Sequence, residues 1–376
     1  MLDTERIKNR IPTRRVKLKY LSISFNSSIQ VNSLSDTGKT PVYGASGIAG
    51  YTNELGIDRD YLGIVKDGAG AGRINCYKKG SLLSNTLSYI IPQKNVEINW
   101  LKYSIISLNL SETIDKTTIP HIYFSDYGNR FLYYLSFEEQ NKISKYLDQK
   151  CAEIDRLIEI ENQQIEKLKE YKQAVITEAV TKGLDKSAPM KPSGVEWIGE
   201  IPEDWRICRI KNVAIISNGK EIEADGGEVP VYGSGGIFKY TDKPLFSGTS
   251  LLLGRKGTID KPMLVQGDFW TVDTMFYTSE IRNIAPKYLY YCAKSLICFD
   301  FFKSGSVLPS MTQSELNNIF ITYPDFYTQN QIVEYLDKKC FNIDSLIEIK
   351  QKKIDKQNEY KKSLIYEYVT GKKEVV

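Results

Sequence analysis

Small polar and cationic side chains gather beside glycines at three places in the first half of this 376-residue chain, and equivalents recur in the second half. One place is a Tyr-Gly loop, one is a glycine turn flanked by cations, and one lies shortly before a long helical pattern. Hydroxyls, amides and cations on glycine-shaped loops suit contacts with phosphates and base edges. The candidates for such contacts are Tyr43, Gly44, Ser46, Lys66, Arg73, Lys116, Thr117, Thr118 and His121, and then Tyr232, Gly233, Ser234, Arg255, Lys256, Lys303, Ser304, Ser306 and Ser310.

These residues also have a plainer interpretation. The tyrosines and glycines could form turns that the fold itself requires, because glycine adopts backbone conformations closed to other residues. The cations Arg255, Lys256, Lys303 and Lys116 could be ordinary surface charge. If Arg255 and Lys256 contact phosphate, alanine at either position should weaken binding to every sequence and flatten its salt dependence.

Catalytic chemistry finds little support. A single histidine, His121, argues against His-rich metal sites and against a His–carboxylate pair in each half of the chain. The run 68–72 (Gly-Ala-Gly-Ala-Gly) lacks the Lys-Ser/Thr ending of a phosphate-binding loop, and it predicts a tight turn. No amino-methyltransferase tetrapeptide of the Asn-Pro-Pro-Tyr kind is present. We therefore expect binding rather than catalysis, with no metal or cofactor held by this chain.

Composition is compatible with that expectation. Hydrophobic residues make up 41%, charged residues 26%, and the net charge is +4, which permits nucleic-acid binding without arguing for it. No apolar run reaches the roughly 18 residues of a membrane span, and the N-terminus lacks a signal-peptide core. The cysteines show no framework spacing, which favours free thiols and a cytoplasmic location.

The elements that would position the candidates are duplicated 189 residues apart. Residues 140–183 align with 329–372 without a gap, and 23 of these 44 positions are identical, which predicts two equivalent helices. Each carries one apolar stripe with steps of three, four or seven. Ser136 with Glu139 forms a capping box before the first helix, Asp325 caps the second, and Gly183 ends the first. About 45 residues at ~1.5 Å each give a length of ~68 Å.

A lone helix of that length needs a partner for its stripe. We expect the two copies to pair antiparallel across a pseudo-twofold axis; the alternative is that each helix packs on its own domain. The residues predicted for the seam between the helices are Leu147, Cys151, Ile154, Ile158, Ile165, Leu168, Leu336, Cys340, Ile343, Ile347, Ile354 and Leu364.

The domain division follows from these patterns. Short apolar-aromatic runs broken by turns predict two mixed α/β globular parts, at 1–135 and 201–324. The long helices occupy 136–183 and 325–376, and the Pro- and Gly-containing stretch 184–200 links the repeats. The fold class is therefore α+β, with two globular domains separated by two long antiparallel coiled-coil helices and a 189-residue internal repeat.

The combined pattern resembles the specificity subunit of type I restriction–modification enzymes. The opening of the second domain (199–206, Gly-Glu-Ile-Pro-Glu-Asp-Trp-Arg) is similar to the family's opening motif, and 230–237 and 254–258 resemble core elements. So do 303–324, the helix start 329–337 and the run 343–347. One departure is that Arg15 stands where Trp205 stands in the second domain.

The resemblance implies two target-recognition domains that read the unlike halves of a bipartite double-stranded DNA sequence. It implies that the helices act as spacer and as dock for two methyltransferase subunits, with restriction–translocation subunits completing the complex. S-adenosylmethionine, ATP and Mg would then belong to those partners. Two other functions remain open: a nuclease or methylase with its own recognition domains, and a duplicated coiled-coil scaffold without a DNA role.

Overall fold

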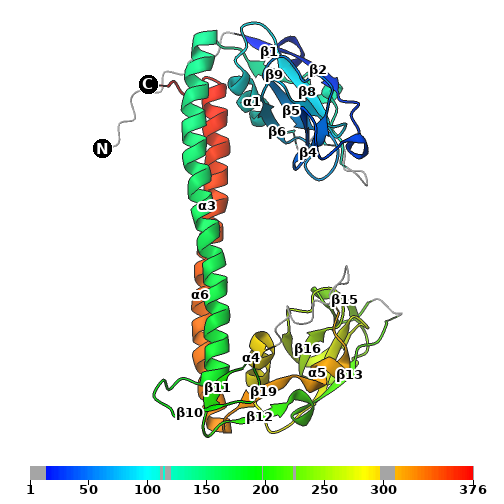
Figure 1. Ribbon diagram of the computed structural model, residues 1–376, viewed down its shortest axis with the longest axis vertical. Helices are drawn as coiled ribbons and strands as arrows, with labels where there is room; N and C mark the ends of the chain where they lie inside the picture. Colours follow the sequence, from blue (N-terminus) through cyan, green and yellow to red (C-terminus); the bar gives the residue numbers. More distant parts are fainter. Residues whose placement is uncertain are drawn as a thin grey trace. The chain divides into compact units, whose positions relative to one another are not determined.

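The computed structural model describes residues 14–110, 113–114, 120–196, 198–222, 226–296 and 310–375. The chain forms two compact units. The first comprises Met1–Glu161 with Gln351–Val376, and the second comprises Asn162–Lys350. Each unit joins a globular domain to one segment of each long helix, α3 (Phe137–Lys182) and α6 (Phe326–Val369) (Figure 1).

The domain of the first unit is built on a four-stranded sheet in the order β2-β8-β5-β6 and a three-stranded sheet in the order β4-β3-β7. Its central strand β5 is buried throughout, because its residues are apolar on both faces. Helix α1 lies between the sheet and the long helices (Figure 1). The bounds are β1 (Arg15–Lys17), β2 (Ser22–Asn26), β3 (Thr40–Gly44), β4 (Gly47–Thr52), β5 (Tyr61–Val65), β6 (Ile74–Tyr77), β7 (Leu82–Leu83), β8 (Leu87–Pro92), α1 (Ile98–Ser107), α2 (Phe124–Tyr127) and β9 (Phe131–Tyr133), with single 3₁₀ turns at Leu18–Tyr20 and Val31–Ser33.

The domain of the second unit repeats this arrangement with one difference. Its strands form a single sheet in the order β13-β18-β16-β17-β14-β15. Strand β17 is long enough to pair with both β16 and β14, whereas β6 and β7 divide these roles in the first domain. The bounds are β10 (Met190–Pro192), β11 (Glu200–Pro202), β12 (Arg206–Arg209), β13 (Ala214–Asn218), β14 (Val229–Gly233), β15 (Gly236–Thr241), β16 (Phe246–Gly254), β17 (Met263–Thr271), β18 (Met275–Ile281), α4 (Pro286–Leu296), α5 (Gln313–Asn318) and β19 (Phe320–Tyr323), with a 3₁₀ turn at Ile210–Asn212.

Both helix starts are capped as the sequence predicts. The Ser136 hydroxyl accepts from the Glu139 backbone N–H at 3.3 Å, and the Glu139 carboxylate accepts from the Ser136 backbone N–H at 3.1 Å. Asp325 accepts from the backbone N–H groups of Tyr327 and Thr328. Gly183, with φ +74°, ends α3 in a left-handed conformation that glycine adopts without strain.

Within each unit the segments of α3 and α6 run antiparallel. In the first unit Tyr146 lies against Tyr368, and Asp155 pairs with Lys361 at 2.6 Å. In the second unit the repeat-equivalent pair, Lys172 with Asp344, also lies at 2.6 Å. As the residue numbers of these contacts rise along α3, those of their partners fall along α6. The helix segments are therefore antiparallel, which confirms the predicted direction.

The residues predicted for the seam divide between the units. Leu147, Cys151, Ile154 and Leu364 share one buried cluster with the first domain's core, and Leu336 and Cys340 share another with the second domain's core. The stripe therefore packs on the partner helix and on the globular domain together, so the two sequence-based alternatives both describe part of the packing. Ile165, Ile343 and Ile354 are also buried, while Ile158, Ile347 and Leu168 are half-buried.

Buried glutamines fasten each domain to its long helix. The Gln140 side chain accepts from the Glu97 backbone N–H at 2.8 Å and donates to the Leu135 carbonyl at 2.8 Å. Its repeat equivalent, Gln329, accepts from the Ala285 N–H at 2.8 Å and donates to the Pro324 carbonyl at 2.9 Å. Asp148 and Asp337 add a second fastening, since each accepts a hydrogen bond of 2.7 Å from a tyrosine hydroxyl, that of Tyr103 or Tyr291.

The strand register corrects one sequence alignment. β1 pairs Arg15 with Tyr133, and β12 pairs Ile207 with Thr322, the repeat equivalent of Tyr133. Arg15 is therefore the counterpart of Ile207 rather than of Trp205. The repeat offset is 192 residues in this strand, because hydrogen bonding to the last strand of each domain, β9 or β19, fixes the register. Trp205 is buried beside Gly183, where a Cβ would lie 3.1 Å from its ring.

No helix in the described part of the chain combines the length and apolar content that a membrane span requires.

Candidate nucleic-acid interface

Three segments of the first domain meet at one place, called here the first loop cluster (44–47, 66–73 and 120–123). The Arg73 guanidinium donates to the Ala45 carbonyl, which ties the glycine turn to the tip of the β3–β4 hairpin. The Gly68 N–H donates to the Pro120 carbonyl at 2.9 Å, and the Ile122 N–H donates to the Lys66 carbonyl at 2.9 Å. All three kinds of candidate segment therefore lie together.

The second domain builds the equivalent second loop cluster (233–236, 254–258 and 310–312). The Met311 N–H donates to the Arg255 carbonyl at 2.9 Å, which reproduces the bond between Ile122 and Lys66 at the 189-residue offset. A Cβ on Gly257 would lie 3.4 Å from the Ser234 hydroxyl, so the glycine turn again touches the hairpin tip.

The tyrosines of the hairpins pack inward. The Tyr43 ring lies 5.0 Å from the Tyr77 ring, and the Tyr232 ring lies 6.3 Å from the Phe269 ring. Both tyrosines are half-buried, and Gly44 and Gly233 are buried. This packing favours the structural interpretation for these four residues, whereas Ser46 at the first tip is exposed and Ser234 is half-buried.

The cations differ in how they are held. The Lys66 side chain is 19% exposed and pairs with Asp67. The Arg255 guanidinium donates to the Asp273 carbonyl at 3.2 Å and lies 6.0 Å from the Phe276 ring. Arg73 and Lys256 are exposed. Each cluster therefore has one anchored cation at the start of its glycine turn, Lys66 or Arg255, at repeat-equivalent positions.

His121 is held by Asp67, a residue that the sequence reasoning did not select. The His121 Nδ1 lies 2.8 Å from an Asp67 carboxylate oxygen, and the two residues also form a backbone bridge. Burial alone would raise the pKa of Asp67, but hydrogen bonds from Lys66 and His121 outweigh it and hold the pKa below its ordinary value. Asp67 is therefore ionised at neutral pH and acts only as an acceptor.

The equivalent backbone bridge in the second domain joins Lys256 to Ser310, which is exposed. A signal for Asp67 was present in the sequence, because its counterpart at the 189-residue offset is Lys256, a reversal of charge within an otherwise equivalent turn. The remaining candidates, Lys116, Thr117, Thr118, Lys303, Ser304 and Ser306, lie outside the described residues.

Among the residues that the structure describes, no group of three or more His, Cys, Asp or Glu side chains could hold a metal ion. Burial raises the pKa of the Cys151, Cys292 and Cys340 thiols, and these side chains are inert packing groups rather than nucleophiles.

The chain thus carries two repeat-equivalent clusters of hydroxyls and cations, each on a domain joined to the paired helices by buried hydrogen bonds. The chain belongs to the family of type I restriction modification DNA specificity domains, which it matches over 22–170 and again over 202–340. Its role is therefore DNA recognition as a type I specificity subunit.

Named relatives agree with this family. The type I restriction enzyme MjaVIII specificity subunit of Methanocaldococcus jannaschii is 29% identical over 364 residues, which cover 85% of this chain and 80% of the relative. The MjaIX specificity subunit of the same organism is 30% identical over 183 residues, or 41% of each chain.

A solved structure shares the fold. A chain from a study of complex assembly and conformational transition of the type I R-M system aligns with a TM-score of 0.68 at 14% identity, covering 96% of this chain and 98% of that one. The S subunit of a type I system from M. genitalium aligns over 97% of this chain and 98% of its own with a TM-score of 0.43 at 14% identity.

Proposed function

We propose that each globular domain reads one half of a bipartite, asymmetric DNA sequence, and that the paired helices dock two copies of one methyltransferase subunit. The chain itself contributes no catalytic group. Methyl transfer, and any ATP-driven cleavage, belong to partner subunits with their own S-adenosylmethionine, ATP and Mg.

One observation carries the DNA-reading part of this proposal. The two loop clusters share a backbone framework, with the same 2.9 Å hydrogen bond and the same bridge at repeat-equivalent positions, yet they present different side chains. An equal framework with unlike side chains suits two readers that bind the same kind of target with different base preferences.

Selection from a pool of duplexes with randomised sequence tests this part. The chain, purified with its modification subunits, should enrich two blocks of preferred bases separated by a fixed number of unselected positions. The two blocks should differ in sequence. Enrichment of a single continuous block, or of a palindrome, would contradict the bipartite asymmetric target.

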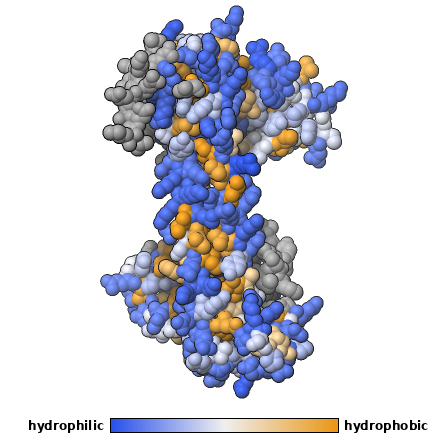
Figure 2. Space-filling view, turned by 90° about the vertical axis from the view of Figure 1, so that its left-hand side faces the viewer, coloured by the Kyte–Doolittle hydropathy of each residue, from blue (hydrophilic) through white to orange (hydrophobic). Residues whose placement is uncertain are grey.

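The docking part rests on exposed apolar side chains of the helices. Leu157, Ile160 and Tyr360 form the first outer patch, and they are 50%, 40% and 59% exposed. Their repeat equivalents Leu346, Ile349 and Tyr171 form the second outer patch, and they are 48%, 62% and 52% exposed. Figure 2 shows exposed apolar residues on the helix segments. Two patches with identical residues suit two copies of one partner.

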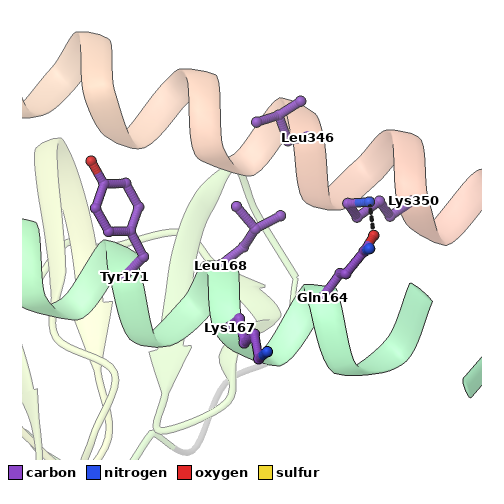
Figure 3. Close-up of a pocket in the computed structure, with 6 residues that line it drawn as sticks. All are labelled: Gln164, Lys167, Leu168, Tyr171, Leu346 and Lys350. Atoms are coloured by element: carbon purple, nitrogen blue, oxygen red, sulfur yellow. Dashed lines mark hydrogen bonds between the residues drawn. The ribbon is translucent and has the colours of Figure 1, made fainter. Parts of the chain in front are cut away.

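The second outer patch borders a groove between α3 and α6. Leu168, Tyr171 and Leu346 line it, and a hydrogen bond between Lys350 and Gln164 crosses between the helices at one end (Figure 3). Apolar side chains from both helices therefore face a shared groove with a polar end, which suits an amphipathic helix of the partner.

Charge substitutions in the patches test the docking. Leu157→Asp and Leu346→Asp should each lower the number of methyltransferase subunits bound per chain from two to one, because each places a charge in a desolvated contact. The double variant should bind none. Leu55→Asp is the matched control, since Leu55 is 95% exposed and lies in neither patch. Retention of two methyltransferase subunits by the double variant, measured by native mass spectrometry, would refute this docking surface.

A further inference from the structure

In each loop cluster an isolated backbone β-bridge joins two residues, and the side chains of these residues differ between the two domains. Asp67 bridges to His121 in the first domain, and Lys256 bridges to Ser310 in the second. Both positions match at the 189-residue offset, so a shared backbone geometry displays two different side-chain pairs. The neighbouring position does not change in sign, since Lys66 and Arg255 are both cations.

The shared cation and the reversed charge suit two different kinds of DNA contact, one with phosphate and one with base edges. Phosphates lie along every DNA sequence, and a cation at the same position in both domains suits them. A carboxylate is repelled by phosphate, so an acidic residue among cations gains nothing from the DNA backbone. It does gain from the exocyclic amino groups of cytosine and adenine, which donate hydrogen bonds in the major groove.

The geometry of Asp67 is compatible with such a contact. One of its oxygens accepts from His121 at 2.8 Å and the other accepts from Lys66. Each carboxylate oxygen can accept two hydrogen bonds, so acceptor capacity remains, and the side chain is 27% exposed. The partners also fix its orientation, because His121 is itself stacked on Tyr123 with an angle of 20° between the rings.

Resting on the proposed function, we infer that positions 67 and 256 are equivalent base-reading positions with opposite preferences. Asp67, oriented by His121, selects a base that presents an amino group, cytosine or adenine, in the half-site of the first domain. Lys256 selects guanine, whose O6 and N7 are both acceptors, in the half-site of the second domain.

Asp67→Asn in the complete complex with the modification subunits tests this inference. An amide retains the size of the side chain but presents a donor as well as an acceptor. Duplex selection should show the preference for cytosine or adenine at one position of the first half-site reduced about tenfold, with the second half-site unchanged. Asp60→Asn is the matched control. Asp60 lies before β5 whereas Asp67 follows it, and Asp60 also pairs with a lysine, Lys78, at 2.8 Å.

The reciprocal variant is Lys256→Asp. This substitution should leave the fold intact, because Lys256 lies at the surface. It should replace guanine by cytosine or adenine at one position of the second half-site only. Unchanged base preferences in both variants, or uniform weakening without a change in preference, would overturn the inference. If the complex without either substitution selected no bipartite sequence, the proposed function itself would fail. That outcome is distinguishable from the two outcomes that would overturn the inference alone.

Discussion

The two glycine turns share a cation at one position and differ in charge at the next. Lys66 and Arg255 keep their positive charge at equivalent positions, while the next residue reverses its charge. The sequence allowed the selection of the cations, the serines and His121. For Asp67 the sequence offers only the reversal of charge against Lys256, and the hydrogen bond from His121, 54 residues away, is evident only in the fold.

Arg255→Ala should weaken binding to specific and unrelated duplexes by a similar factor. A phosphate contact releases about one counterion, so the slope of log K against log salt should become shallower by about one. Salt titration of DNA binding by the complete complex measures both effects. Arg206→Ala, an exposed arginine on β12 in the same domain, is the control and should change neither. Weakening confined to one specific sequence would mean that Arg255 reads a base instead.

The hairpin tyrosines show the limit of motif-based selection. Tyr43 and Tyr232 stand in matching Tyr-Gly loops, which made them candidates for contact with DNA. Their rings pack against Tyr77 and Phe269, which gives both tyrosines a role in the fold. A repeated motif indicates that both domains need the residue, but it does not distinguish a need of the fold from a need of the target.

At the scale of elements, the starts of the long helices were predictable almost to the residue, whereas α6 ends at Val369 rather than at the expected residue 376. Their apolar steps and capping residues are local features, and the observed helices begin at Phe137 and Phe326. The attachment of each domain to its helix was not predictable, because it joins residues more than 40 positions apart, such as Glu97 with Gln140. The identities at positions 140, 148, 329 and 337 now have a physical reason in these fastenings.

Gln140→Leu should destabilise the first unit by about 1–3 kcal/mol, because the partly buried Glu97 N–H and Leu135 carbonyl would lose their hydrogen-bond partner. Thermal unfolding should therefore show a lower midpoint for the transition that includes the first domain. Gln149→Leu, on the exposed side of α3, is the control. An unchanged midpoint for Gln140→Leu would show that the glutamine fastening adds no stability.

At the scale of the whole molecule, the duplication was evident in the sequence and the strand offset was not. Identity along 140–183 and 329–372 established the 189-residue repeat. The 192-residue offset of β1 and β12 depends on hydrogen bonds to β9 and β19, which sequence identity does not report.

If the helices act as the spacer, their length sets the gap between the half-sites. Seven extra residues inserted in α3 after Gln163 and in α6 after Lys352 preserve the apolar stripe and add ~10 Å. The gap should widen by about three base pairs while both half-sites keep their sequences. Changed half-sites with an unchanged gap, in the selected duplexes, would refute a role for the helices as a ruler.

We propose above all that one chain gives a type I complex two different reading domains. Single-molecule sequencing of methylated bases, in a host carrying the modification subunits with and without this chain, tests it most directly. We predict methylation that depends on the chain, at sites made of two unlike half-sites with a constant gap. Methylation that persists without the chain, or sites with a single continuous or palindromic sequence, would contradict the account.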